Sequence, residues 1–217
     1  MTKYDNSIDR ILNIEWNVIK TLMDTLDRNV MALVIDMLMS AKPESHKVIT
    51  AGCGTMGTVA RRVAHTLSVI EVPALYCSPS NSIHGGMGVI QKNDIVILFS
   101  KGGNTQEILN YIPVCKAKEA KIIAVTQNDT SMLATNSDVY LKIQVDTEAD
   151  KWNMCASASC NAVAAVFDAI AFTIMEFSGF TIEDLMLTHS GGGLGERLKT
   201  IDNEESVTNG RQYLKQR

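Results

Sequence analysis

The chain has 217 residues, of which 46% are hydrophobic and 20% are charged, and its formal net charge is -4. That length suits one large α/β domain with a substantial buried core. Its basic residues are scattered along the chain, so the charge pattern excludes a nucleic acid or an anionic membrane surface as an expected partner.

No segment has the pattern of a targeting signal or a membrane span. The first 20 residues carry Asp5, Asp9 and Glu15 and are amphipathic, which argues against a secretory signal. The longest apolar stretch, residues 162–175, contains Asp168 and is too short to cross a bilayer. The 5 cysteines are odd in number and form no C-x-x-C pair, as is typical of buried thiols in a reducing compartment. We therefore expect a cytoplasmic protein.

The apolar pattern predicts helices first and then alternating strands and helices. Apolar residues spaced three and four apart in residues 7–41 predict two helices with a break near 27–29. Five predicted strands follow, at residues 47–52, 74–78, 94–100, 121–127 and 138–145. Segments long enough for crossover helices join them, which favours a parallel, doubly wound sheet.

The expected fold class is α/β, a flavodoxin-like three-layer αβα sandwich with a five-stranded parallel sheet. A long apolar helix at about residues 156–177 is expected to cover one face of the sheet. Residues 199–217 are polar and show no apolar period, so we expect a single domain over residues 1–198 followed by a tail or an oligomer arm.

Three glycines follow the first predicted strand in the spacing G-x-G-x-x-G, at Gly52, Gly54 and Gly57. A dinucleotide site also requires an acidic residue at the end of the second strand, to bind the adenosine ribose. That strand ends in LYCSPSNS, residues 75–82, which contains neither Asp nor Glu. A nicotinamide cofactor is therefore disfavoured, although backbone N–H groups at the start of the following helix still suit an anion.

A second polar loop follows the third predicted strand. Ser100, two glycines, Asn104 and Thr105 precede a predicted helix that carries Glu107. In a sheet of order 2-1-3-4-5, ligands bind where the first and third strands end side by side. Because the two glycine-containing loops follow these two strands, the sequence favours one phosphate-sized site. The alternative is that the glycines only form tight turns and that Ser100 and Thr105 only cap a helix.

Several blocks of the sequence, spread over residues 7–198, match the motifs of one family. They are GCGTMGTVARRVAHTL (52–67), HGGMGVI (84–90), DIVILFSKGGNTQEI (94–108), TEADKWNMCASASC (147–160), DAIAF (168–172) and GFTIEDLMLTHSGGGLGERL (179–198). On these motifs the chain resembles the sugar isomerase (SIS) domain family, and most of all the arabinose 5-phosphate isomerases. The last block is the most specific, because the family has a similar GFT-x-ED run that ends in HPGG-x-LG.

The resemblance implies a sugar phosphate bound at the carboxyl ends of the strands, with no cofactor and no metal. The substrate-binding residues that we expect on this basis are Gly54, Thr55, Ser100, Lys101, Gly103, Asn104, Thr105, Ser157 and Ser159. The resemblance also places Glu107, Glu148, His84 and His189 at catalytic or near-catalytic positions.

Aldose–ketose isomerisation requires a base that moves a proton between C1 and C2 and a second group that opens the sugar ring. We assign Glu148 as the carbon base, because a closed pocket raises the pKa of a carboxylate toward neutrality, and His189 as the ring-opening group. Glu107 would support them. From the residues alone, Glu107 would only complement a helix dipole, His84 would equally well be a structural histidine, and Glu148 and His189 would be solvated loop residues. Asp168 is expected to be a buried, hydrogen-bonded group rather than a catalyst.

The family keeps a lysine in its first glycine loop where this chain has Thr55, and either Lys101 or Lys151 could restore the charge. The expected function is a sugar-phosphate aldose–ketose isomerase whose exact sugar stays open. The alternative is a non-catalytic sugar-phosphate sensor or regulatory module, and a third option is another SIS activity such as a lyase. A homodimer or homotetramer is expected, since family members build their sites partly from neighbouring subunits.

Overall fold

The computed structural model describes residues 2–198. By its internal contacts the chain divides into two compact units, Met1–Ser178 and Gly179–Arg217. The prediction of one domain over residues 1–198 stays a prediction, and the predicted tail, residues 199–217, lies outside the described residues.

Two helices begin the first unit, α1 over Asp5–Thr25 and α2 over Arg28–Ser40, as the apolar spacing predicted. Asp27 separates them because its carboxylate caps α2, accepting hydrogen bonds from the backbone N–H groups of Asn29 at 2.8 Å and Val30 at 3.2 Å. Helix α1 packs along α8, yet Leu22 is the one buried residue of α1.

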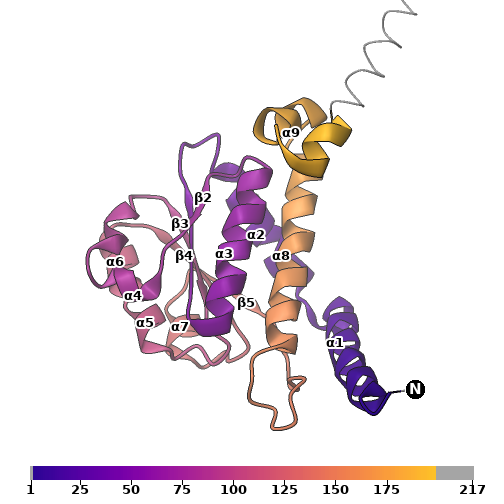
Figure 1. Cartoon of the computed structure of the whole chain (residues 1–217). Helices are drawn as coiled ribbons and strands as arrows, with labels where there is room; N and C mark the ends of the chain where they lie inside the picture. The colour runs from indigo at the N-terminus through magenta and orange to yellow at the C-terminus, as the bar shows by residue number, and fades with distance from the viewer. Residues whose placement is uncertain (1, 199–217) are drawn as a thin grey trace, which may run out of the picture. The chain divides into compact units, whose positions relative to one another are not determined.

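The sheet has five parallel strands in the order β2-β1-β3-β4-β5, which confirms the predicted topology (Figure 1). They are β1 (Val48–Gly52), β2 (Ala74–Tyr76), β3 (Ile95–Phe99), β4 (Lys121–Thr126) and β5 (Val139–Lys142). Strands β1 and β3 pair in register to their last residues, Gly52 opposite Phe99. The loops that leave these two strands therefore start side by side, at the point where the order of the strands reverses.

Helices cover both faces of the sheet (Figure 1). Helices α3 (Gly54–Val69) and α8 (Ala158–Phe177) lie with α1 and α2 on one face. The other face carries short elements: α4 (Pro79–Ser82), the 3-10 helix η1 (Gly86–Val89), α5 (Gln106–Leu109), α6 (Tyr111–Ala117) and α7 (Met132–Thr135).

Strand β3 shows how the two helical layers pack on the sheet, because alternate residues of a strand point to opposite faces. The Phe99 ring packs edge-on against the Phe167 ring of α8, with centroids 5.2 Å apart, while Leu98 belongs to the apolar cluster around Tyr111 on the other face. Both faces are thus buried, as the continuous apolar strand sequences require. The three-layer sandwich is confirmed.

Helix α8 is the one helix of the described residues that is long and apolar enough to cross a membrane, but 56% of its most apolar window is buried inside the protein. Its 20 residues run beyond the apolar stretch recognised in the sequence. It packs against α1, α2 and α3, as the core helix of an α/β protein does. Asp168 is not buried, contrary to expectation: it lies at the rim of this packing and pairs with Arg62, Oδ2 to Nη2, at 2.6 Å.

The second unit contains α9, Ile182–Thr188. A capping box begins this helix: the Thr181 hydroxyl accepts from the Asp184 N–H at 3.2 Å, and the Asp184 carboxylate accepts from the Thr181 N–H at 2.9 Å. His189 follows directly as the C-terminal cap residue.

Candidate functional site

The glycine loop, residues 52–57, joins β1 to α3 at very short range. A Cβ atom at Gly57 would lie 2.6 Å from the Gly52 carbonyl oxygen, and a Cβ atom at Gly52 would lie 2.8 Å from the Met56 carbonyl oxygen. Only glycines allow the helix to start this close to the strand. Thr55 is exposed in the first turn of α3, and the loop carries no charged side chain.

The serine loop, residues 100–105, joins β3 to α5 and is closed by hydroxyl groups. The Ser100 hydroxyl accepts a hydrogen bond from the Gly103 N–H at 3.1 Å and lies 2.9 Å from the Thr105 hydroxyl. The backbone of Lys101 is anchored to the neighbouring strand, since its carbonyl accepts from the Thr126 hydroxyl at 2.8 Å. The loop is thus a fixed turn with hydroxyl and N–H groups at the carboxyl end of β3.

The Asn104 side chain makes a hydrogen bond that connects the serine loop to a neighbouring helix. Its side-chain oxygen accepts from the Met132 N–H at 3.0 Å, at the start of α7. The side chain that was expected to bind substrate is therefore used to hold the serine loop against α7.

Glu148 joins the serine loop to the beginning of α8. Its Oε1 atom accepts from the Lys101 Nζ at 2.6 Å. Its Oε2 atom accepts from the N–H groups of Ser157 at 2.9 Å and Ser159 at 3.1 Å, and from the Ser157 hydroxyl at 3.3 Å. The carboxylate is only 2% exposed. Four predicted site residues therefore meet in one cluster around the buried carboxylate, which we call the Glu148 cluster: Lys101, Glu148, Ser157 and Ser159.

The expected protonation of Glu148 is wrong. Burial does raise the pKa of its carboxyl group, but the Lys101 ammonium and the N–H groups of Ser157 and Ser159 outweigh burial and hold the pKa at about 2, against an ordinary 4.5. A closed pocket can be inferred from the sequence, but the donors that the fold brings into it cannot. In this state Glu148 is fully ionised near neutral pH and is a weak base.

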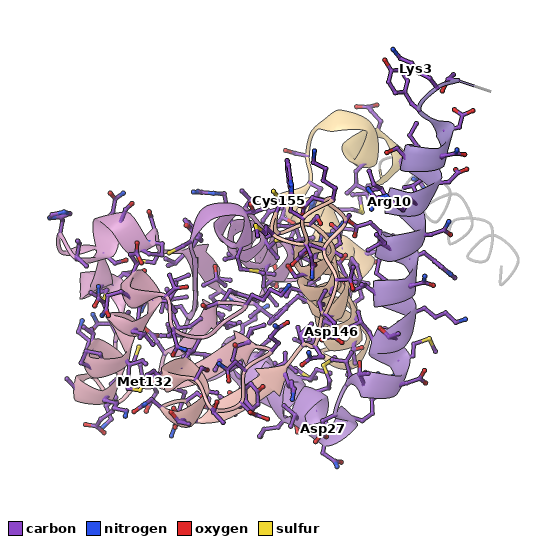
Figure 2. The ribbon with its side chains drawn as sticks, turned by 90° about the horizontal axis from the view of Figure 1, so that it is seen from below. Lys3, Arg10, Asp27, Met132, Asp146 and Cys155 are labelled. Atoms are coloured by element: carbon purple, nitrogen blue, oxygen red, sulfur yellow. The ribbon has the colours of Figure 1, made fainter. Side chains whose placement is uncertain are left out.

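The segment after β5 lies beside α1, where Arg10, Asp146 and Cys155 are labelled in Figure 2. The Arg10 guanidinium donates to the Ala149 carbonyl at 3.2 Å, so α1 holds the residue next to Glu148. No sequence signal pointed to Arg10, because the contact spans 139 positions.

The two lysines that could restore the missing charge have different surroundings. Lys151 is exposed, and its Nζ lies 4.2 Å from the centre of the Trp152 ring. Of the two lysines, Lys101 is the one that hydrogen-bonds to the Glu148 carboxylate. Of these two lysines, Lys101 is the one that the serine loop itself supplies.

Glu107 and His84 lie outside the Glu148 cluster. Glu107 is exposed, and it lies in the first turn of α5 as predicted. Burial, and to a smaller extent the negative charge of Glu107, raise the pKa of the Cys53 thiol in the glycine loop. His84 is exposed between α4 and η1. His189 belongs to the second unit, where its Nδ1 lies 3.1 Å from the Leu185 carbonyl oxygen.

A cavity of about 550 Å³ lies between α3 and α8. Its lining runs along α3 from Thr55 to Arg62 and from Ala156, just before α8, to Asp168 within it, with Ile19 of α1. Thr55 and Ser157 therefore border one space, although they are far apart in sequence. Among residues 2–198, no group of three or more His, Cys, Asp or Glu side chains could hold a metal ion.

Two loops with N–H and hydroxyl donors at the reversal point of a doubly wound sheet are typical of α/β proteins that bind a small anionic ligand. The family model for the SIS domain matches residues 43–175. The chain belongs to the SIS domain family.

Curated relatives carry the name arabinose 5-phosphate isomerase KdsD. The Francisella tularensis protein is 30% identical over 91% of this chain and 60% of its own length, and the Pseudomonas aeruginosa protein is 31% identical over 89% of this chain and 58% of its own. The chain therefore spans about 60% of the length of these relatives.

Two solved structures match over their whole length. A putative sugar-phosphate isomerase from Listeria monocytogenes is 37% identical, with a TM-score of 0.84, and covers 88% of this chain and 100% of its own. An Escherichia coli protein in complex with arabinose 5-phosphate is 31% identical, with a TM-score of 0.82, and covers 87% of this chain and 100% of its own.

Proposed function

We propose that the protein is a sugar-phosphate isomerase that interconverts an aldose phosphate and a ketose phosphate. The observation that carries this proposal is the position of the serine loop next to the buried Glu148 carboxylate, at the carboxyl ends of the strands. Relatives and similar structures named as isomerases support it. Arabinose 5-phosphate is the first substrate to test, and other pentose and hexose phosphates follow.

In this proposal the phosphate group binds to the serine loop. The Ser100 and Thr105 hydroxyls and the backbone N–H groups of the turn supply neutral donors. The Ser159 hydroxyl is buried beside the Glu148 carboxylate at the start of α8, and Ser159 belongs to the proposed binding set. The proposed binding set also includes Gly54, Thr55 and Ser157, together with the neighbouring residues of their loops.

The proposed reaction moves one proton between neighbouring carbons of the open-chain sugar. Glu148 removes the proton from C2 of the aldose, and the enediol that results takes the proton back at C1 while the hydroxyl proton moves from O2 to O1. His189 opens the ring as acid and base, and Glu107 and His84 support these steps.

Activity assays on a panel of pentose and hexose phosphates test the proposal. Wild-type protein is expected to turn over at least one of them, and Glu148→Gln and His189→Ala are each expected to lower kcat by about a hundredfold or more, since each removes a proton-transfer group. His65→Ala, at an exposed position of α3, is the matched control and should keep full activity. An absence of turnover on the whole panel at high enzyme concentration would contradict catalysis.

A sensor or regulatory module is the second candidate, favoured by the weak basicity of Glu148 in its pair with Lys101. Thermal unfolding separates the two candidates. A bound sugar phosphate at 100 times its Kd stabilises the fold by about 2.7 kcal/mol whether or not it is converted. Stabilisation without turnover would support the sensor.

We also propose that the protein forms a homodimer or homotetramer through α1. One face of this helix exposes apolar side chains, with Trp16 64% and Met23 74% exposed, and Ile8, Leu12 and Ile19 lie on the same face. An amphipathic helix with an uncovered apolar face usually has a partner surface.

Trp16→Glu is expected to shift the protein toward the monomer, because it places a charge in the proposed interface, and light scattering at several concentrations would measure the mass. Asn13→Glu adds the same charge to an exposed polar position of α1 and should leave the mass unchanged. A monomeric wild-type protein would contradict this proposal.

We also propose that the protein is located in the cytoplasm. All five cysteines lie in the described part of the chain and are free thiols, as is usual in a reducing compartment. Cys77, Cys115 and Cys160 are buried, whereas Cys53 and Cys155, next to the site, are partly or fully exposed.

A further inference from the structure

We propose that Lys101 alternates between two partners, the Glu148 carboxylate in the free protein and the anionic group of the substrate in the complex. Binding of the anion would thereby release Glu148 to act as a base. This inference rests on the proposed function, because it needs an anionic ligand at the serine loop.

Lys101 is placed to reach both partners. It follows Ser100 directly, and its backbone is fixed, because its carbonyl accepts from the Thr126 hydroxyl at 2.8 Å and from the Gln127 N–H at 3.1 Å. Its side chain is 32% exposed and has a flexible four-carbon stem. The ammonium can therefore turn while the loop that carries it stays in place.

Other hydrogen bonds hold the Glu148 carboxylate in position when Lys101 moves away. Only its Oε1 atom accepts from Lys101. Its Oε2 atom accepts from the N–H groups of Ser157 and Ser159 and from the Ser157 hydroxyl, at the start of α8. The carboxylate would keep three donors without the lysine. The exchange of partners thus moves only the flexible Lys101 ammonium, and the buried Glu148 carboxylate stays in position.

The exchange changes the chemistry of Glu148. With Lys101 paired to an incoming anion, the largest single donor to the carboxylate is gone, so the pKa of Glu148 rises from about 2 toward its ordinary value and its basicity increases. The other titratable groups around it are Cys160 on α8 and Glu15 and Arg10 on α1, and the Arg10 guanidinium is bound to the Ala149 carbonyl. Among residues 2–198, Lys101 is the cation that hydrogen-bonds to the Glu148 carboxylate.

Sulfate titrations by calorimetry test the exchange. Sulfate imitates a phosphate group and keeps its charge throughout the neutral pH range, so protonation of the ligand does not enter the result. The proteins are the wild type, Glu148→Gln, the double variant Lys101→Met with Glu148→Gln, and Lys151→Met as the control at an exposed lysine two positions beyond Ala149. The double variant leaves no unpaired buried charge, and circular dichroism confirms that each variant is folded.

Glu148→Gln is expected to bind sulfate about fivefold or more tightly than the wild type, because the lysine no longer has a competing carboxylate. The double variant should lose this gain and bind about tenfold or more weakly than Glu148→Gln, since a charge-assisted contact to the anion is gone. Lys151→Met should stay within about twofold of the wild type.

Equal affinities of Glu148→Gln and the double variant would overturn the inference, because the gain would then come from removed repulsion alone. Unchanged or weaker binding by Glu148→Gln would overturn it as well. Wild-type protein that binds neither sulfate nor any sugar phosphate would instead contradict the proposed function, and the two failures are thereby distinguished.

Discussion

Lys101→Met is expected to lower the free energy of unfolding by about 3 kcal/mol near neutral pH, because it leaves a buried carboxylate without its ion-pair partner. The Glu148 side chain is 2% exposed, and its Oε1 atom lies 2.6 Å from the Lys101 ammonium. The expected loss is at the lower end for a broken buried pair, because donors from Ser157 and Ser159 remain. Urea unfolding at constant ionic strength measures it.

The matched control is the double variant of Lys101→Met with Glu148→Gln. It removes both charges and keeps the hydrogen-bonding shape of the side chain at 148, so most of the stability should return. A double variant as unstable as Lys101→Met would show that the cost lies in lost packing of the lysine stem rather than in the unpaired charge.

The same pair predicts how stability depends on pH. The pKa of Glu148 is about 2 in the folded protein and 4.5 is its ordinary value, so its contribution is complete above about pH 4.5 and is lost as the pH falls toward 2. Glu148→Gln should remove this part of the acid sensitivity. An unchanged acid-unfolding profile in that variant would contradict the assignment.

Gly103→Ala is expected to cost about 3 kcal/mol of stability or more and to weaken anion binding. Gly103 has φ of +71°, and an added Cβ atom would lie 2.1 Å from the Ser131 Oγ and 2.4 Å from the Ser131 Cβ. A strained backbone costs about 1–2 kcal/mol, and overpacking adds about 1–3 kcal/mol. The serine loop would have to move away from Ser131, and its hydroxyl and N–H groups would no longer converge.

Gly102→Ala provides the comparison in the same loop. Gly102 has no atom within 4 Å of an added Cβ, so this change should be close to neutral in thermal unfolding and in sulfate binding. Equal effects of the two substitutions would show that the loop needs glycine for flexibility in general, and not for the close approach to Ser131.

Anion affinity, basicity and stability all depend on Lys101 in these predictions. A residue that stabilises the free protein through Glu148 must give up that contact to bind the substrate, so part of the binding free energy is used to activate the base. This arrangement would offset the uncharged Thr55 in the glycine loop, since the cation would come from the serine loop instead.

The sequence by itself determined the fold. Continuous apolar strands alternating with helical segments predicted β1 to β5 to within a few residues, and crossover connections left few possible topologies. The break between α1 and α2 was likewise readable, because Asp27 is a local capping signal. Such features depend on residues close together in the chain, and a local pattern records them.

The tertiary structure alone decided the chemistry of the glycine loop, the serine loop and Glu148. A predicted phosphate loop proved to hold its own lysine against a carboxylate 47 positions away, and Asp168 proved to pair with Arg62, 106 positions away. The pKa of Glu148 is lowered rather than raised because four donor groups converge on its carboxylate from the serine loop and from the start of α8. Burial can be read from apolar neighbours in a sequence, but the donors that compensate it are brought together only when the chain folds.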